Sequence, residues 1–154
     1  GTILDNIFLG DNKLRKDDLF LKKCIEIVEL KKFIKNLPAG LNTILGEQSI
    51  NLSGGQRQRI GILRALIRKP KVIILDESTS NLDYTSELDV YKNIEPMLET
   101  KGLIVIAHRY STIKNSDLII FIDSGRILEM GTHDELLTKK GAYYNQLKSG
   151  ELIE

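Results

Sequence analysis

The stretch that decides the fold is Val72-Ile73-Ile74-Leu75, followed directly by Asp76-Glu77. Its four apolar residues do not alternate with polar ones, a pattern typical of a strand that is covered on both faces. Residues 103–107 and 118–122 repeat the pattern. Because parallel strands between layers of helices have this composition, an α/β fold with a parallel sheet is predicted.

Helical periodicity precedes these strands. After Asp17, which can cap a helix, apolar residues recur at three- and four-residue spacing and predict a one-sided amphipathic helix built on Leu19, Phe20, Cys24, Ile27 and Val28. The helical character continues over residues 30–37 until Pro38-Ala39-Gly40 ends it. The first 50 residues are therefore expected to be helical and peripheral.

Two further helices are predicted beside the strands. The first covers residues 56–68 and stops at Lys69-Pro70. The second is capped by Asp83 and should be kinked or interrupted by Pro96. The order strand, helix, strand implies a right-handed crossover.

Two local signals mark the end of the chain. Ser124-Gly125 predicts the turn of a short hairpin after the last of the three strands. Thr132 and Glu135 stand three residues apart, as a capping box requires, and predict a terminal helix. His133 falls in the first turn of this helix and is expected to be a surface residue.

Composition limits the classes of function. The chain has 154 residues, the length of one ordinary domain, with 22 Lys and Arg against 21 Asp and Glu. A net charge of +1 provides no general attraction to nucleic acid or anionic lipid. The single cysteine cannot form an internal disulfide, which is typical of an intracellular protein. The apolar runs are about a quarter of the ~20 residues that a membrane-spanning helix needs.

The predicted helix over residues 56–68 carries a group of arginines. Arg57, Arg64 and Arg68 form a stripe opposite its apolar face, which is typical of a solvated face and not of a nucleic-acid surface. Arg59 instead projects within the apolar arc. Because a charge there needs a carboxylate or carbonyl partner, Arg59 is predicted to be a structural anchor.

Asp76 and Glu77 are the first candidates for chemistry. They stand at the carboxyl end of a predicted buried strand, which is where α/β sheets place their ligands. One carboxylate can hold Mg²⁺, while its neighbour, pointing the other way along the pleat, can orient a water for attack on a phosphoryl group. Taken alone, such a pair is more often an acidic turn.

A second candidate is the loop Leu52-Ser53-Gly54-Gly55-Gln56, just ahead of a predicted helix. Its two glycines let the backbone approach a ligand closely, and the helix N-terminus behind them presents free N–H groups and a positive dipole. This combination suits a phosphate. Taken alone, Ser-Gly-Gly before a helix is usually a plain loop with a serine or glycine cap.

Together these motifs resemble those of the ATP-binding-cassette (ABC) ATPases. In the family's order, Leu52 to Gln56 with Arg57-Gln58-Arg59 is similar to the signature, Ile73 to Glu77 to Walker B, Ser80-Asn81-Leu82-Asp83 to the D-loop, and Ala107-His108-Arg109 to the switch histidine. Residues 1–7 resemble the segment after the family's Q-loop, and residues 125–133 resemble the tail of exporter-type members. The resemblance implies part of a P-loop NTPase (RecA-like) fold: α/β, with a parallel sheet, helices on both faces and a helical subdomain at the front.

The resemblance also implies roles for individual residues. Asp76 would hold Mg²⁺, Glu77 would be the general base or water-orienting group, and His108 would contact the γ-phosphate. The signature residues Leu52, Ser53, Gly54, Gly55 and Gln56 would bind ATP held by a second copy of the domain, and Ser80 and Asp83 belong to the D-loop. ATP and Mg²⁺ are the expected cofactors.

The sequence departs from the family at the phosphate-binding loop. It contains no Gly-x-x-x-x-Gly-Lys-Ser/Thr of a Walker A motif, and its start at Gly1 without methionine suggests a segment of something longer. We therefore expect this chain alone to be inactive as an ATPase. Residues 1–70 are predicted to form a helical subdomain that ends in the signature and its helix, and residues 71–154 the α/β part.

Three functions remain open. The leading one is the nucleotide-binding domain of an ABC exporter, which couples ATP hydrolysis to transport together with a second nucleotide-binding domain and transmembrane domains, at the cytoplasmic face of the cell membrane. The second is a lobe of a soluble ABC-type ATPase, such as a chromosome-maintenance or DNA-repair head, although the first 30 residues show no heptads. The third is a non-enzymatic interaction module. No nucleic-acid partner is expected.

Overall fold

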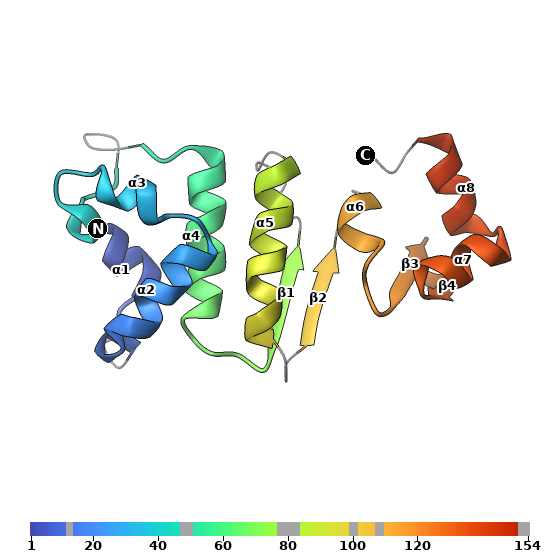
Figure 1. The fold of residues 1–154 in the computed structure, drawn as a ribbon, viewed down its shortest axis with the longest axis horizontal. Helices are drawn as coiled ribbons and strands as arrows, with labels where there is room; N and C mark the ends of the chain where they lie inside the picture. The colour runs from blue at the N-terminus through green and yellow to red at the C-terminus, as the bar shows by residue number, and fades with distance from the viewer. Residues whose placement is uncertain (12–13, 47–50, 77–83, 99–101, 107–109, 151–154) are drawn as a thin grey trace. The chain divides into compact units, whose positions relative to one another are not determined.

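The structure is a computed structural model that describes residues 1–11, 14–46, 51–76, 84–98, 102–106 and 110–150 (Figure 1). The chain divides into two compact units, unit 1 (Gly1–Ile104) and unit 2 (Val105–Glu154). Each unit is described by itself.

Unit 1 begins with helices and continues into a sheet. Its helices are α1 (Ile3–Phe8), α2 (Asp18–Ile27), α3 (Lys31–Lys35), α4 (Gly54–Leu66) and α5 (Tyr84–Ile94), with short 3₁₀ helices η1 (Leu14–Lys16), η2 (Gly40–Asn42) and η3 (Glu95–Leu98). Its strands are β1 (Val72–Asp76) and β2 (Gly102–Ile106), and β2 crosses the boundary into unit 2.

The predicted cap of α2 and the predicted interruption at Pro96 are confirmed, whereas α4 begins and ends two residues earlier than the predicted range 56–68. Asp17 caps α2, because its side chain accepts a hydrogen bond of 3.0 Å from the N–H of Phe20. Beyond the end of α4 the backbone turns through a left-handed conformation at Lys69 (φ 50°), just before Pro70. α5 ends at Ile94 and passes into η3, which contains Pro96, so the proline interrupts the helix as predicted.

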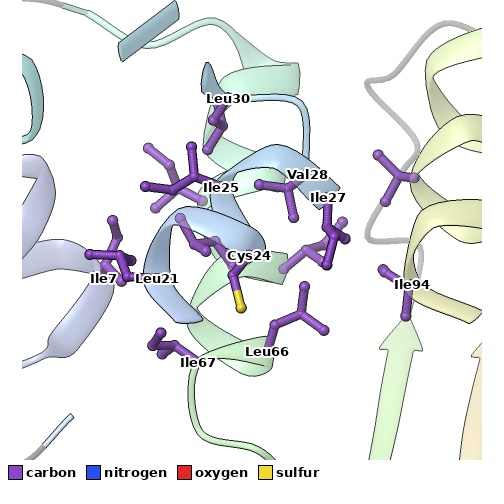
Figure 2. Close-up of a cluster of buried hydrophobic side chains, with 14 of the residues drawn as sticks. Ile7, Leu21, Cys24, Ile25, Ile27, Val28, Leu30, Leu66, Ile67 and Ile94 are labelled. Atoms are coloured by element: carbon purple, nitrogen blue, oxygen red, sulfur yellow. The ribbon is translucent and has the colours of Figure 1, made fainter. Parts of the chain in front are cut away.

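One apolar core holds unit 1 together (Figure 2). Its buried residues come from α1, α2, α4, β1, α5 and the turn after α2: Ile3, Ile7, Phe8, Leu21, Cys24, Ile25, Ile27, Val28, Leu30, Ile60, Ile62, Leu63, Leu66, Ile67, Ile73, Leu75, Val90 and Ile94. The sequence analysis expected the front helices to be peripheral. This expectation is wrong, because they share a core with β1 and α5. Short helices need such a partner, because an isolated helix of this length is marginal in water.

The buried face of α2 is rotated from the predicted one. Leu19 is 81% exposed, whereas Leu21 and Ile25 are buried beside Cys24. The spacing rule finds an apolar stripe on α2, but the position of α4 decides which edge of that stripe is covered.

β1 and β2 are neighbours in a two-stranded sheet, and Figure 1 shows them running in the same direction. On β1, Ile73 and Leu75 are buried while Val72 and Ile74 are 52% and 62% exposed. Among the described residues the strand is thus covered on one face, whereas its sequence predicts cover on both.

Unit 2 contains a hairpin and three helices. β3 (Ile119–Asp123) and β4 (Arg126–Gly131) pair antiparallel through the predicted turn, with Ser124 and Gly125 both left-handed at φ 49° and 73°. The helices are α6 (Tyr110–Ile113), α7 (His133–Lys139) and α8 (Ala142–Ser149). Thr132 and Glu135 form the predicted capping box of α7.

A small core of Ile119, Leu136 and Tyr143 joins the hairpin to the helices of unit 2. In the part of the chain that the structure describes, no helix has both the length and the apolar character that crossing a membrane requires.

Candidate functional site

The N-terminus of α4 is built from the predicted signature residues. Ser53 is the N-cap: its hydroxyl accepts a hydrogen bond from the N–H of Gln56 (3.2 Å), and the Gln56 side-chain carbonyl accepts one from the N–H of Ser53 (2.8 Å). Arg57 donates a hydrogen bond of 2.6 Å to the carbonyl of Leu52. These bonds fix the loop and the first turn as one rigid piece.

This helix end is open to an anion. The backbone N–H groups of Gly54 and Gly55 have no acceptor within the described part of the chain, and the first turn holds no acidic residue. Both N–H groups lie at the positive end of a 13-residue helix. A phosphate group fits such an end, because it would satisfy the two N–H groups and meet no negative charge.

Asp76 is the last residue of β1 and is an exposed residue. Figure 1 shows that α4 begins and β1 ends toward the same end of unit 1. Mg²⁺ prefers carboxylate and water oxygens, so the side chain fits as one ligand of this ion. The other predicted site residues, Glu77, Ser80, Asp83 and His108, lie outside the described residues.

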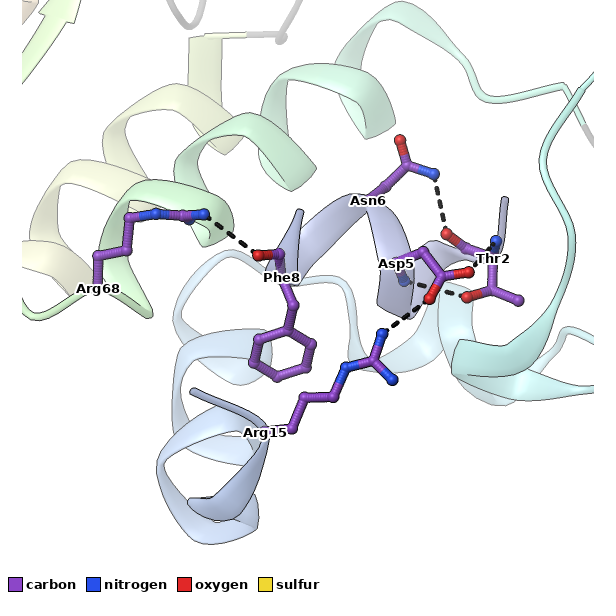
Figure 3. Close-up of polar contacts among 6 residues, drawn as sticks. All are labelled: Thr2, Asp5, Asn6, Phe8, Arg15 and Arg68. Atoms are coloured by element: carbon purple, nitrogen blue, oxygen red, sulfur yellow. Dashed lines mark hydrogen bonds and ion pairs between the residues drawn. The ribbon is translucent and has the colours of Figure 1, made fainter. Parts of the chain in front are cut away.

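Arg64 of α4 and Arg68, two residues beyond the end of this helix, both contact α1, which the sequence did not indicate. Arg64 Nε donates a hydrogen bond of 2.9 Å to the carbonyl of Asn6. Arg68 Nη2 donates one of 3.4 Å to the carbonyl of Phe8 (Figure 3). Arg57 and Arg68 are exposed, as expected of a solvated stripe, whereas Arg64 is half-buried, so the expectation is wrong for Arg64 alone. The carbonyl groups at the C-terminal end of α1 have no N–H donor within the helix. The guanidinium groups donate hydrogen bonds to them instead.

Arg59 is a structural anchor, as predicted. Its guanidinium donates to the backbone carbonyl of Glu29 (3.2 Å) and forms an ion pair with the carboxylate of the same residue (3.0 Å). The Arg59 side chain is only 17% exposed, so the pair ties α4 to the turn between α2 and α3 from a largely buried position.

The N-terminus of α1 is also capped. Thr2 and Asp5 form a capping box, and Arg15 forms an ion pair of 2.8 Å with Asp5 (Figure 3). The backbone hydrogen bond from Thr2, then its hydroxyl and the Arg15 guanidinium, lower the pKa of Asp5 to about 2.

His133 is not a plain surface residue, contrary to expectation. Its Nε2 shares a hydrogen bond of 3.1 Å with the hydroxyl of Tyr110, and its Nδ1 shares one of 3.0 Å with the hydroxyl of Tyr143. Tyr143 is fully buried, and burial raises the pKa of its hydroxyl to about 12. Only the fold brings these three residues together, so no spacing rule could have found them.

Comparison with known proteins shows a consistent set of relatives. The model of the ABC transporter family matches residues 3–80. P-glycoprotein 14 of Caenorhabditis elegans is 46% identical over 154 residues, which cover 99% of this chain and 11% of the relative. The alpha-hemolysin translocation ATP-binding protein HlyB of Escherichia coli O157:H7 is 46% identical over 149 residues, which cover 95% of this chain and 20% of the relative.

A solved structure agrees with these matches. The structure of a bacterial Atm1-family ABC exporter with ATP bound is 34% identical, with a TM-score of 0.87 over 96% of this chain and 26% of that chain. The likeness confirms the predicted α/β fold class.

The fold and the signature turn define the class of protein as an ABC-type nucleotide-binding domain of the exporter type. The chain belongs to the ABC transporter family. It spans between a tenth and a fifth of the length of the two relatives described above.

Proposed function

We propose that this chain acts as part of the nucleotide-binding domain of an ABC exporter, where ATP hydrolysis at a composite dimer site drives transport. The observation that supports this most directly is the open N-terminus of α4, with two N–H groups free in the described structure and no acid in its first turn. The similarity of the whole chain to exporter relatives supports the transport role.

Each predicted residue has a task in this proposal. Gly54 and Gly55 donate their N–H groups, and Ser53 its hydroxyl, to the γ-phosphate of ATP held by a second nucleotide-binding domain. Asp76 holds Mg²⁺, which when bound neutralises charge on the phosphates. Glu77 orients the attacking water and accepts its proton.

His108 completes the proposed site with a hydrogen bond to the γ-phosphate. Leu52 and Gln56 hold the signature turn in shape, and Ser80 and Asp83 form the D-loop. Residues 1–70 would act as the helical subdomain and residues 71–154 as the α/β part. The partners are a second nucleotide-binding domain and transmembrane domains, at the cytoplasmic face of the membrane.

A charge placed at the signature tests the proposed binding mode. In the complete ABC protein that contains this chain, Gly55→Asp should reduce ATP turnover at least about tenfold, because a carboxylate there repels the phosphate. The same carboxylate is favourable to the N-terminus of α4, so helix stability should not fall. Gly61→Asp is the matched control, since Gly61 lies on the same helix and nothing beyond the helix's own backbone lies within 4 Å of a Cβ at that position.

Turnover in the Gly55→Asp protein equal to that of the Gly61→Asp protein would contradict the anion-binding role.

Glu77→Gln should keep ATP binding and slow hydrolysis by about 10²- to 10⁴-fold, because the amide cannot accept a proton. Unchanged turnover in the Glu77→Gln variant would show that another group orients the attacking water and accepts its proton.

The 154-residue chain by itself should neither hydrolyse ATP nor bind Mg-ATP tightly, because it contains no Walker A loop. Isothermal titration calorimetry of the purified chain measures this directly. Tight Mg-dependent binding would show that the residues present suffice for a nucleotide site.

A further inference from the structure

The turn between α2 and α3 holds one residue in an unfavourable backbone conformation. Glu29, just beyond α2, is left-handed with φ 55°, a region that glycine adopts far more readily than a residue with a Cβ. The turn closes through two backbone hydrogen bonds of 3.0 Å, from the N–H of Glu29 to the carbonyl of Glu26 and from the N–H of Leu30 to that of Ile25. Neither bond requires a glutamate side chain, so the reason for this residue lies outside the turn.

Arg59 of α4 binds both the main chain and the side chain of this glutamate. Its Nη1 donates a hydrogen bond of 3.2 Å to the carbonyl of Glu29, and its Nη2 lies 3.0 Å from Oε2 of the carboxylate. The planar guanidinium group suits such a paired contact, because its donors have a fixed geometry. The contact offsets the cost of the left-handed backbone and joins the turn to α4 within unit 1.

This contact limits how α4 can rotate about its own axis. The apolar side chains of α4 pack into the core of unit 1 through contacts without a preferred direction, whereas hydrogen bonds are directional. Arg59 follows Gly55 by four residues, so the two residues lie on the same side of α4, about 6 Å apart along its axis. The turn is also held from α5, because Asn93 donates a hydrogen bond of 3.4 Å to the carbonyl of Ile27.

We propose that Arg59 is a positioning residue for the phosphate-binding end of α4: through Glu29 it fixes the rotation of the helix and hence the place of the N–H groups at its start. The inference rests on the proposed function, in which the N–H groups of Gly54 and Gly55 bind the γ-phosphate of ATP. Arg59 itself touches no nucleotide. Because Cα atoms lie about 2.3 Å from the helix axis, a rotation of about 20° moves each of them by about 0.8 Å. Misplacement on this scale is enough to slow an enzyme strongly.

The test measures ATP turnover and inhibition by ADP in the complete ABC protein, with rates taken per folded protein. Arg59→Lys keeps the charge but cannot form the paired contact with Glu29. It should lower kcat/KM for ATP about tenfold, because the misplaced N–H groups bind the γ-phosphate less well. ADP has no γ-phosphate, so its inhibition constant should stay within about twofold.

Glu29→Gly breaks the same contact from the other side without straining the turn. Glycine is favoured at φ 55°, so the turn should form at least as readily, while Arg59 loses its carboxylate partner. kcat/KM should fall by a similar factor, and the double variant should be no slower than the slower single variant, because both changes break one link. If Arg59→Lys does not fold, Glu29→Gly decides the test.

Lys31→Met is the matched control. Lys31 forms an exposed ion pair with Glu26 beside the same turn, and this pair does not include α4. The inference is overturned if the Arg59 and Glu29 variants turn over like Lys31→Met, or if their losses multiply in the double variant. It is also overturned if inhibition by ADP weakens by the same factor as kcat/KM for ATP falls, because the change would then not be specific to the γ-phosphate.

Gly55→Asp separates this inference from the function on which it rests. Slow turnover in Gly55→Asp together with normal turnover in Arg59→Lys and Glu29→Gly overturns the positioning role alone. Turnover in Gly55→Asp equal to that in Gly61→Asp overturns the anion-binding role of this helix end, and the positioning role with it.

Discussion

The start of α8 depends on a carboxylate from a strand. Glu129 of β4 accepts hydrogen bonds from the N–H groups of Ala142 (3.1 Å) and Tyr143 (3.0 Å), which are unpaired donors of the first turn. Gly141 leaves room for this carboxylate, because a Cβ at that position would overlap Glu129 Oε1 and lie 2.6 Å from its Cδ. Gly141→Ala should therefore displace the Glu129 side chain and break the hydrogen bonds that join α8 to β4 of the hairpin.

The structure sets the size of this effect. Glu129→Gln keeps one carbonyl acceptor but turns an NH₂ group toward the second N–H, so one charge-assisted hydrogen bond and the favourable charge at the helix end are lost, about 2 kcal/mol in total. Gly141→Ala breaks both hydrogen bonds and should cost about 3 kcal/mol. In both variants the lost stability is that of α8 and of its contact with β4.

Hydrogen exchange of the α8 amides, followed by mass spectrometry, measures the loss locally. A cost of about 2 kcal/mol should lower protection over residues 142–149 about 30-fold in Glu129→Gln, and more in Gly141→Ala. Gly61→Ala is the control for the added methyl group, because nothing lies near a Cβ at that position. Protection of α8 in Gly141→Ala equal to that in Gly61→Ala would refute the reasoning.

Three further changes test other contacts of unit 1. The stability that Asp5 contributes should be complete above its usual pKa of 3.8 and lost as pH falls through its lowered pKa of about 2; a carboxyl NMR titration would contradict this if Asp5 titrated near 3.8. Arg59→Met should lower the free energy of unfolding by about 2 kcal/mol, because the Glu29 carboxylate loses its partner, and an unchanged urea midpoint would show that the pair is unimportant. Arg64→Met should cost about 1 kcal/mol and speed amide exchange in α1, whereas unchanged exchange there would mean that the bond to Asn6 does not hold the helix.

Signals that act within a few residues could be read from the sequence. Asp17, the Thr132–Glu135 pair and Pro96 each work on backbone groups three or four positions away, so their effects do not depend on the rest of the fold. The capping box of α4 is of the same local kind, since Ser53 and Gln56 satisfy each other.

Contacts between distant segments could not be read in this way. Arg64 reaches Asn6 across 58 positions, and His133 reaches Tyr110 across 23, so neither partner shares a local pattern with the other. The choice between Leu19 and Leu21 as the buried residue of α2 depends on where α4 lies. These features follow from packing, which spacing alone does not specify.

The hydrogen bonds from Arg64 and Arg68 couple the position of α1 to that of α4. At its other end α1 is joined to the segment before the signature, where Ile3 N–H donates to the Thr43 carbonyl and Leu45 N–H to the Gly1 carbonyl, each at 3.0 Å. α4 is 13 residues long, about 20 Å, so a tilt of about 10° about one end moves the other by about 3 Å. The hydrogen bonds from Arg64 and Arg68 link α1 to this helix. A displacement of the signature end of α4 is therefore expected to move the first residues of the chain as well.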